Sequence, residues 1–416
     1  MTDPTMIRLP LPPVGRPAVA EWVAESLPSL VRGPVTASAI VGGQQSADAA
    51  LAAFDVTGYA RRRNEVWPPE RRGASGLSPY IRHGLLPLPR VWEHVGDGPA
   101  DDVAKFRDEL LWQEYARHLY ARLGSATRRS LRYSVVEHGD VTVNPWEGEA
   151  ACLSLAWREL VERGWLPNQA RMWLASHWSV RSGLGWRDGE DVFYRHLLDG
   201  SRAANRAGWQ WTVGALTGKA YGFSRWQVEK RAPGLCAQCP LSDRCPIGDW
   251  PAEQSPEPRT MVDPRVRRDP DLEGTSGPTD AIVTGRADAV WLTAESLGDD
   301  DPSLAAHPDL PAVFVFDEPL LARLRLAPTR LVFLAETLAD LGTRRAVEIW
   351  LGDPTQVLHG RAVAGTFTPV PGWQRRAALI RPVDIRPWPW LVRPHAGSLT
   401  SFTAWARGGR GPVVGR

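Results

Sequence analysis

Helical periodicity dominates residues 42–250. Apolar side chains recur there every three or four positions, the spacing that places them on one face of a helix. The pattern is clearest in residues 101–123, where Val103, Phe106 and Leu110 fall on such a face. The same criterion predicts further helices at 152–163, 167–181, 190–198 and 224–231. We therefore expect this part of the chain to be a mostly α-helical domain.

The pattern changes after residues 251–279, which are dense in Pro, Glu, Asp and Arg and are typical of a linker. Short apolar runs then alternate with helical periods, of which the longest runs from 319 to 341. Strands that alternate with helices predict a small doubly wound sheet of the Rossmann-like kind. The predicted strands are 288–292, 312–317 and 346–351. The expected organisation is an N-terminal extension at 1–41, a helical domain at 42–250, a linker at 251–279 and an α/β domain at 280–416.

Composition and charge limit the possible partners. Hydrophobic residues make up 43% of the chain, and the formal net charge is only +2, so any nucleic-acid-binding surface has to be local. Basic stretches at 121–132 and 201–232 are candidates, although solvated helix faces explain them equally well. No segment approaches the ~20 apolar residues that span a bilayer, and the N-terminus lacks a signal-peptide pattern. We expect a cytoplasmic protein with no membrane partner.

The first candidate site is a turn at residues 74–80, Ala-Ser-Gly-Leu-Ser-Pro-Tyr. Small hydroxyl residues and backbone N–H groups at a helix start suit a phosphate group. The turn resembles the TSRLSPYL-type turn of the cryptochrome/photolyase family, which holds the pyrophosphate of FAD, although a threonine and an arginine are replaced. The resemblance implies FAD contacts at Ser75, Leu77 and Ser78, and also at Tyr59, which is similar to a flavin-contacting tyrosine of the family.

A second segment, residues 106–115, is similar to the ELxWREF helix of the same family. In that helix the glutamate contacts the damaged base pair and the tryptophan stacks on it. Glu109 and Trp112 match these two positions and lie three residues apart, on one helical face. The resemblance also implies that Phe106, Glu109 and Gln113 lie at the flavin, with Gln113 in place of the usual arginine.

Two further segments follow in family order. Residues 164–172 resemble the GWMHNRLRM motif, with Asn168 and Arg171 at cofactor-binding positions. A proline replaces the histidine of this motif, which weighs against a histidine-dependent (6-4) photolyase. Residues 199–211 resemble DGDxAxNxGxWQW, the most specific of the four motifs. There Asp199 matches one flavin-site aspartate, Ser201 replaces the other, and Asn205 falls where the family places the residue that faces flavin N5.

Tryptophan is abundant, with 20 residues in the chain. Trp209 and Trp186 match the first two members of the family's tryptophan electron relay, and the third member is not placed. Each motif alone has a plain structural explanation, because a tryptophan is usually a core residue and Asp-Gly is a common turn. Four motifs in family order favour the flavin interpretation.

The four cysteines suggest a metal site. Cys236, Cys239 and Cys245 share one short loop, with proline after the second and third, a common setting for thiolate ligands. The fourth is Cys152, far upstream. This arrangement resembles the iron–sulfur branch of bacterial cryptochromes and photolyases, which implies a [4Fe–4S] cluster on all four cysteines. Zinc, or four unligated thiols, are the alternatives.

The C-terminal part resembles the antenna domain of the family at residues 288–352, and residues 398–407 resemble its xFTPFxR segment. Because that domain precedes the FAD domain in family members, the resemblance implies a circularly permuted chain. An ordinary Rossmann-like domain is the alternative. The basic run of the antenna motif is missing. The sequence therefore does not indicate which antenna chromophore the protein binds, or whether it binds one at all.

The resemblance as a whole implies a photolyase that uses FAD and blue light to repair pyrimidine dimers in DNA, with damaged DNA as its partner. The alternative is a cryptochrome-like photoreceptor or a divergent flavoprotein without repair activity. Replacements in the motifs, such as Gln113 and Ser201, favour the alternative, whereas Glu109 and Trp112 favour repair. The sequence indicates no lesion type, protein partner or oligomeric state.

Overall fold

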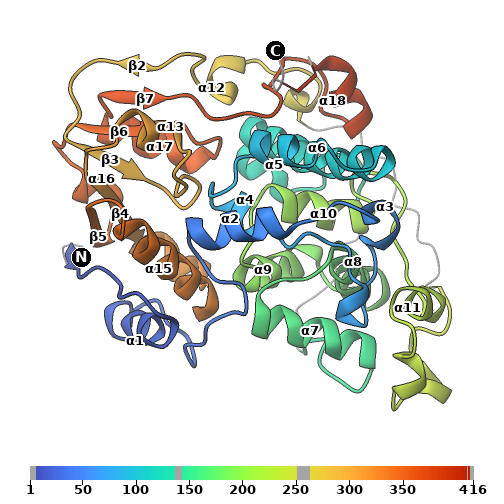
Figure 1. Cartoon of the computed structure of the whole chain (residues 1–416). Helices are drawn as coiled ribbons and strands as arrows, with labels where there is room; N and C mark the ends of the chain where they lie inside the picture. The colour runs from blue at the N-terminus through green and yellow to red at the C-terminus, as the bar shows by residue number, and fades with distance from the viewer. Residues whose placement is uncertain (1–5, 136–142, 251–262, 410, 413–416) are drawn as a thin grey trace.

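The computed structural model describes residues 6–135, 143–250, 263–409 and 411–412. A mostly helical part lies beside a smaller part built on a sheet (Figure 1). This arrangement confirms the predicted fold class. All four predicted segments fall partly outside the described residues, namely at 1–5, 136–142, 251–262, 410 and 413–416.

The sheet has seven strands within the described chain, in the order β1-β5-β4-β3-β6-β7-β2. The five central strands run parallel, and the edge strands β1 and β2 are antiparallel to their neighbours. All side chains of β3 and β6 are buried, so both faces of the sheet are covered there. The strands are β1 Ile7–Leu9, β2 Ile282–Val283, β3 Ala289–Leu292, β4 Ala312–Asp317, β5 Val347–Gly352, β6 Val363–Thr366 and β7 Asp384–Arg386. The three predicted strands are confirmed as β3, β4 and β5.

The predicted helices of the first part are also confirmed, as α6, α7, α8, α9 and α11. The predicted helix at 167–181 changes pitch, because α8 is followed by a π-helical turn at His177–Arg181. The helices up to residue 231 are α1 Arg16–Ser26, α2 Gln44–Ala53, α3 Tyr59–Arg62, α4 Ser78–Arg82, α5 Leu88–His94, α6 Ala100–Leu123, α7 Ala151–Arg163, α8 Asn168–Ser176, α9 Trp186–His196, α10 Ala204–Thr212 and α11 Arg225–Arg231. The later helices are α12 Leu272–Ser276, α13 Pro302–Ala306, α14 Glu318–Leu324, α15 Pro328–Gly342, α16 Pro354–Val357, α17 Pro371–Ile380 and α18 Phe402–Gly408.

The single long helix expected at residues 319–341 is wrong, because two helices, α14 and α15, occupy this stretch. Arg325 ends α14 in the left-handed conformation, with φ of 51°. Ala327 precedes Pro328 and is extended, as the proline ring requires of its neighbour. Apolar spacing continues across this break, so periodicity alone did not reveal it.

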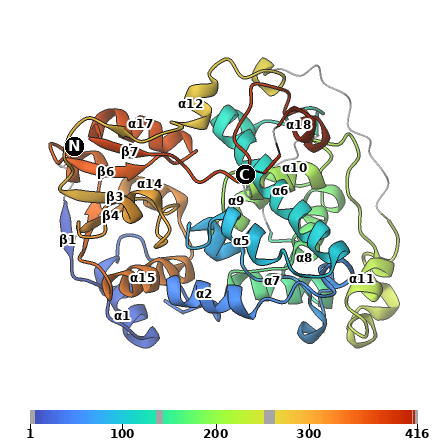
Figure 2. The same cartoon turned by 45° about the horizontal axis from the view of Figure 1, so that its top comes forward.

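The two parts share one apolar core. Leu85 and Leu119 of the helical part belong to the same buried cluster as Leu331 and Phe333 of α15. The N-terminal segment also joins the sheet part, because β1 pairs with β5 and α1 packs on α15 (Figures 1 and 2). After β7 the chain returns to the helical part, where α18 lies against α6. Segments from both ends of the chain therefore hold the two parts together.

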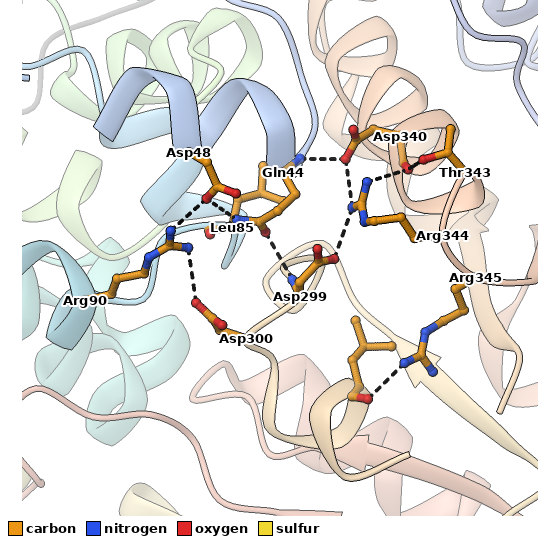
Figure 3. A network of polar contacts seen from close by, with 11 residues as sticks. Gln44, Asp48, Leu85, Arg90, Asp299, Asp300, Asp340, Thr343, Arg344 and Arg345 are labelled. Atoms are coloured by element: carbon orange, nitrogen blue, oxygen red, sulfur yellow. Dashed lines mark hydrogen bonds and ion pairs between the residues drawn. The ribbon is translucent and has the colours of Figure 1, made fainter. Parts of the chain in front are cut away.

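Polar contacts reinforce this junction around the start of α2 (Figure 3). The Gln44 backbone N–H donates to Oδ2 of Asp340 at 2.7 Å, and its side-chain oxygen accepts the backbone N–H of Asp299 at 3.1 Å. Arg344 completes the link with ion pairs to Asp299 and Asp340 at 3.1 and 3.0 Å. Because Gln44 is buried, these hydrogen bonds hold α2 against α15 and against the loop that contains Asp299.

Candidate functional site

A cavity of about 1370 Å³ lies between helices α6, α8, α9 and α10 and the carboxyl ends of β3 and β4. It brings together most of the residues that the sequence singled out. Those that line it are Tyr59, Ser75, Ser78, Glu109, Trp112, Gln113, Asn168, Arg171, Asp199, Ser201, Asn205 and Trp209. The other three, Leu77, Phe106 and Trp186, are buried and do not line it.

The turn at residues 74–78 forms part of the cavity wall. Gly76 has a φ of 71°, in the left-handed region that favours glycine, and a side chain at this position would meet no neighbour. The Ser78 hydroxyl accepts the indole N–H of Trp165 at 3.1 Å, and Ser75 accepts the backbone N–H of Leu77 at 3.4 Å. The turn is thus held by its own hydroxyls beside open space.

An ion pair fixes another part of the cavity wall. Arg171 donates two hydrogen bonds to the Asp199 carboxylate, at 2.7 and 3.2 Å, in the bidentate geometry that sets both side-chain planes. The neighbouring carbonyl oxygen of Gly200 accepts from Arg82 and Arg330, both at 3.1 Å. Because Arg330 belongs to α15, the sheet part holds the loop that carries Asp199.

The first turn of α10 is oriented by a buried carboxylate, Glu190. The Asn205 amide donates to its backbone and side-chain oxygens, both at 3.1 Å. Arg202 and Arg206 pair with the same carboxylate at 2.6 and 3.4 Å. Arg206 and the equally buried Arg122 are therefore engaged inside the protein and do not contribute to the basic surface suggested by the sequence.

Positive charge dominates the cavity lining. Twelve arginines line it against five Asp or Glu side chains among the described residues. Several are tied to backbone oxygens rather than to carboxylates, such as Arg330, which donates to Tyr194 and Gly200. A cavity with this balance suits a ligand that carries phosphate groups.

On α6, Glu109 forms ion pairs with Lys105 at 3.1 Å and Arg63 at 3.4 Å at the cavity edge. Tyr59 lies close by and packs edge-to-face on Phe106, with 4.9 Å between ring centroids. Burial, with a further contribution from Glu109, raises the pKa of the Tyr59 phenol, which therefore stays a neutral hydroxyl at the cavity wall.

Trp209 is buried, lines the cavity, and its indole N–H has no hydrogen-bond partner. Its ring fills the space beside Gly189, where an added Cβ would lie 2.2 Å from the ring. The nearest indole to it is Trp146, at 6.4 Å between centroids. Trp186, the other predicted relay residue, takes part in no ring contact of the described chain.

The sequence missed two tryptophans that the structure brings to this region. Trp146 is fully buried and also contacts Trp178 at 4.7 Å and Trp157 at 5.5 Å between centroids. No motif singles it out, because burial of one tryptophan among many cannot be seen in the sequence. Trp211 lines the cavity with Trp112. It follows Trp209 by two residues in the WQW segment, so its position in that motif was an available signal.

The four cysteines line a separate small pocket and are free thiols. Cys152 lies in the first turn of α7, and the other three lie in the loop after α11. Cys239 Sγ accepts the backbone N–H of Ala151 at 3.4 Å. Burial, and then the neighbouring cysteines, raise the pKa of the Cys152 thiol to about 12. Although the four cysteines share a pocket, the described residues contain no group of three or more His, Cys, Asp or Glu side chains arranged to hold a metal ion.

Comparison with known proteins finds similarity in the region of the chain that forms much of the cavity wall. Residues 106–229 match the family model described as the FAD binding domain of DNA photolyase. This part of the chain is therefore similar to the FAD-binding domain of the cryptochrome/photolyase family. Deoxyribodipyrimidine photo-lyase from Synechococcus is 30% identical over 205 residues, which are 43% of this chain and 39% of that protein. The photo-lyase from Thermus thermophilus is 33% identical over 183 residues, or 41% of this chain and 43% of that protein.

The chain thus spans about two fifths of the length of these cryptochrome/photolyase relatives. Solved structures of the family overlap it in part. A Synechocystis cryptochrome gives a TM-score of 0.40 at 21% identity, covering 44% of this chain and 42% of that one. A class III photolyase from Agrobacterium tumefaciens gives 0.39 at 23% identity, covering 49% and 41%. Within the described residues, no helix is both long and apolar enough to cross a membrane.

Proposed function

We propose that this protein is a photolyase that binds FAD in the large cavity and uses blue light to repair pyrimidine dimers in DNA. One observation carries the proposal: the cavity places Glu109 and Trp112 of α6 together with Asn205 and Trp209 of α10. These side chains come from segments almost 100 residues apart. Their convergence on one arginine-rich cavity supports a common task for them.

The residues fit FAD in charge and shape. The turn at 74–78 leaves open space beside hydroxyls, which suits the pyrophosphate, and Tyr59 offers a neutral hydroxyl. Arg171 and Asp199 would fix the middle of the cofactor, with Asn205 and the unpartnered indole N–H of Trp209 further along the wall. FAD, when bound and reduced, supplies the light-driven electron that splits a dimer.

Damaged DNA would present its lesion to the same cavity. An enzyme that acts on a base inside a duplex flips it out and stacks it on aromatic side chains. Trp112 and Trp211 both line the cavity and offer such rings. Glu109, held by Arg63 and Lys105, would accept hydrogen bonds from the base edges. These roles agree with the names of the relatives but rest on this proposal.

A second proposal concerns the cysteines, which would hold a [4Fe–4S] cluster. Four thiols around one pocket, with a backbone N–H on Cys239, are a donor set suited to a cluster. We expect anaerobic purification to yield about four irons and four acid-labile sulfides per chain. Cys152→Ser should lose the metal as fully as Cys239→Ser, while half-buried Ser154→Ala should retain it. Protein that contains stoichiometric zinc and no acid-labile sulfide would show that the cysteines bind zinc instead.

One observation favours the alternative, a photoreceptor or divergent flavoprotein without repair activity. The Ser201 hydroxyl, which replaces a flavin-site aspartate of the family, accepts the backbone N–H of Ala204 at 3.1 Å. It therefore satisfies the backbone N–H of the first residue of α10 and brings no charge to the cavity. A repair assay separates the two functions.

The test uses purified, chemically reduced protein with an oligonucleotide that carries one cyclobutane thymine dimer. Blue light should restore the two thymines, measured by chromatography, and darkness should not. Trp112→Ala and Glu109→Gln should each lower repair about tenfold or more, whereas Glu162→Gln, on the exposed face of α7, should leave it unchanged. Flavin-loaded protein without light-dependent repair would contradict photolyase activity and favour the photoreceptor.

A further inference from the structure

The C-terminal helix α18 covers one face of Trp112. The Phe402 ring stacks on the Trp112 indole with 4.1 Å between centroids and 9° between planes. Tyr115 meets both rings edge-on, at 5.8 Å from Trp112 and 6.0 Å from Phe402. Phe402 thus covers one face of the Trp112 indole, and Tyr115 packs edge-on against it.

This stack is anchored by buried polar contacts rather than resting on the surface. The Trp405 indole N–H, one turn further along α18, donates to Nδ1 of His118 at 2.8 Å. Nε2 of the same imidazole faces the carbonyl oxygen of Val392 at 2.8 Å, so the histidine bridges two C-terminal segments as a neutral ring. The Tyr115 hydroxyl donates to the carbonyl oxygen of Leu399 at 2.9 Å.

The same face of α6 extends the anchor in both directions. Glu114, which is fully buried, accepts the backbone N–H groups of Leu391 and Val392 at 2.8 and 3.1 Å. Arg122 donates to the carbonyl oxygen of Gly397 at 2.8 Å. Since Glu114, His118 and Arg122 lie four residues apart, they form one stripe on α6 that contacts the C-terminal segment.

Trp112 also lines the large cavity. One indole face is taken by Phe402, so a ring in the cavity can stack only on the other. We propose that Phe402 is a positioning residue that sets the plane of Trp112, and that α18 thereby forms part of the recognition site for a flipped, dimerised base. The DNA part of this inference rests on the function proposed above. It assigns a recognition role to the C-terminal helix of the chain.

The first test observes Trp112 without DNA. In protein labelled with 5-fluorotryptophan, the Trp112 fluorine resonance is identified as the one lost in Trp112→Phe. Phe402→Leu removes the ring but keeps an apolar side chain, and it should shift and broaden this resonance. Phe402→Tyr should restore it, and Thr403→Ala, exposed on the same helix, should not move it. An unchanged Trp112 resonance in Phe402→Leu would overturn the positioning role.

The second test measures binding to a dimer-containing oligonucleotide and to its undamaged copy. Phe402→Leu should reduce the preference for damaged DNA about threefold to tenfold, the range expected for one aromatic stack. In the Trp112→Ala background the same change should add nothing, because Phe402 acts through the indole. If the two changes instead lower the preference for damaged DNA additively, Phe402 does not act through the Trp112 indole. If the unaltered protein shows no preference while the fluorine resonance responds as expected, the proposed DNA function fails and the positioning of Trp112 stands.

Discussion

Single side chains hold the cavity in shape through close packing. Gly189 on α9 is the clearest case, because the Trp209 ring occupies the space that a Cβ would need. Gly189 lies inside α9 at an ordinary helical position, so its backbone conformation does not call for glycine. Glycine is needed there because the Trp209 ring approaches so closely. The position of Trp209 therefore depends on the absence of a side chain on the neighbouring helix.

We expect Gly189→Ala to lower the free energy of unfolding by about 1–3 kcal/mol, the usual cost of overpacking a buried site. Urea unfolding measures this, and flavin content should fall with it. Gly208→Ala is the matched control, because a Cβ there meets no atom within 4 Å. Alanine should be neutral or slightly stabilising in that helix. Equal effects of the two changes would contradict the packing argument.

A buried histidine predicts acid sensitivity. Burial lowers the pKa of His118 from 6.5 to about 3, so the folded protein keeps this ring neutral while the unfolded chain protonates it below pH 6.5. Stability from this residue is therefore present above pH 6.5 and is lost as the pH falls toward 3. The slope is about 1.4 kcal/mol per pH unit for one proton.

His118→Gln should flatten the dependence of unfolding free energy on pH between 6.5 and 4 by about one proton. Glutamine can still bond both partners, so the fold should survive. The exposed His94→Gln is the control and should leave the slope unchanged. A slope unaltered in His118→Gln would show that other groups govern acid unfolding.

At the scale of elements, the sequence predicted long helices well and short or irregular elements poorly. Helices such as α6 have enough turns for the apolar spacing to be unambiguous. Strands β1, β2 and β7 have two or three residues, too few for any period to show. The break between α14 and α15 depends on one left-handed arginine, which the apolar pattern does not report.

That arginine offers a test. Arg325 has φ of 51°, a conformation that costs an ordinary residue about 1–2 kcal/mol and glycine nothing. We expect Arg325→Gly to leave stability unchanged or to raise it by up to about 1 kcal/mol, despite the greater freedom of unfolded glycine. Ala322→Gly, at an exposed position inside α14, should instead cost about 1 kcal/mol. Thermal unfolding of the two variants compares them; destabilisation by both would contradict the break.

At the scale of the molecule, the flavin motifs could be found from the sequence because each is local. Their convergence on one cavity could not, since it depends on the packing of α6, α8, α9 and α10. The sequence matched Trp209 and Trp186 to the first two members of a relay, but it did not reveal that the indole nearest to Trp209 is that of Trp146. The division into domains at 42–250 and 280–416, like the permuted order, stays a prediction. Because both domains contribute to one apolar core, neither is expected to fold fully without the other.

A chain ending at residue 262 would lose the partners of Leu85, Leu119 and Tyr115 in that core. It would also lose the C-terminal segment that satisfies Glu114 and His118. We expect the fragment to show helical circular dichroism but no cooperative unfolding. Adding the purified C-terminal portion should restore a transition. A fragment that unfolds cooperatively by itself would support the independent helical domain.

The central claim is that light absorbed by FAD in this cavity repairs DNA. The action spectrum of repair tests it most directly, because it joins light, cofactor and reaction in one measurement. We predict that the rate of dimer splitting by the reduced protein follows the absorption of its bound flavin across the near-ultraviolet and blue, and is zero in the dark. Repair at no wavelength, or a spectrum unrelated to the bound flavin, would contradict the account.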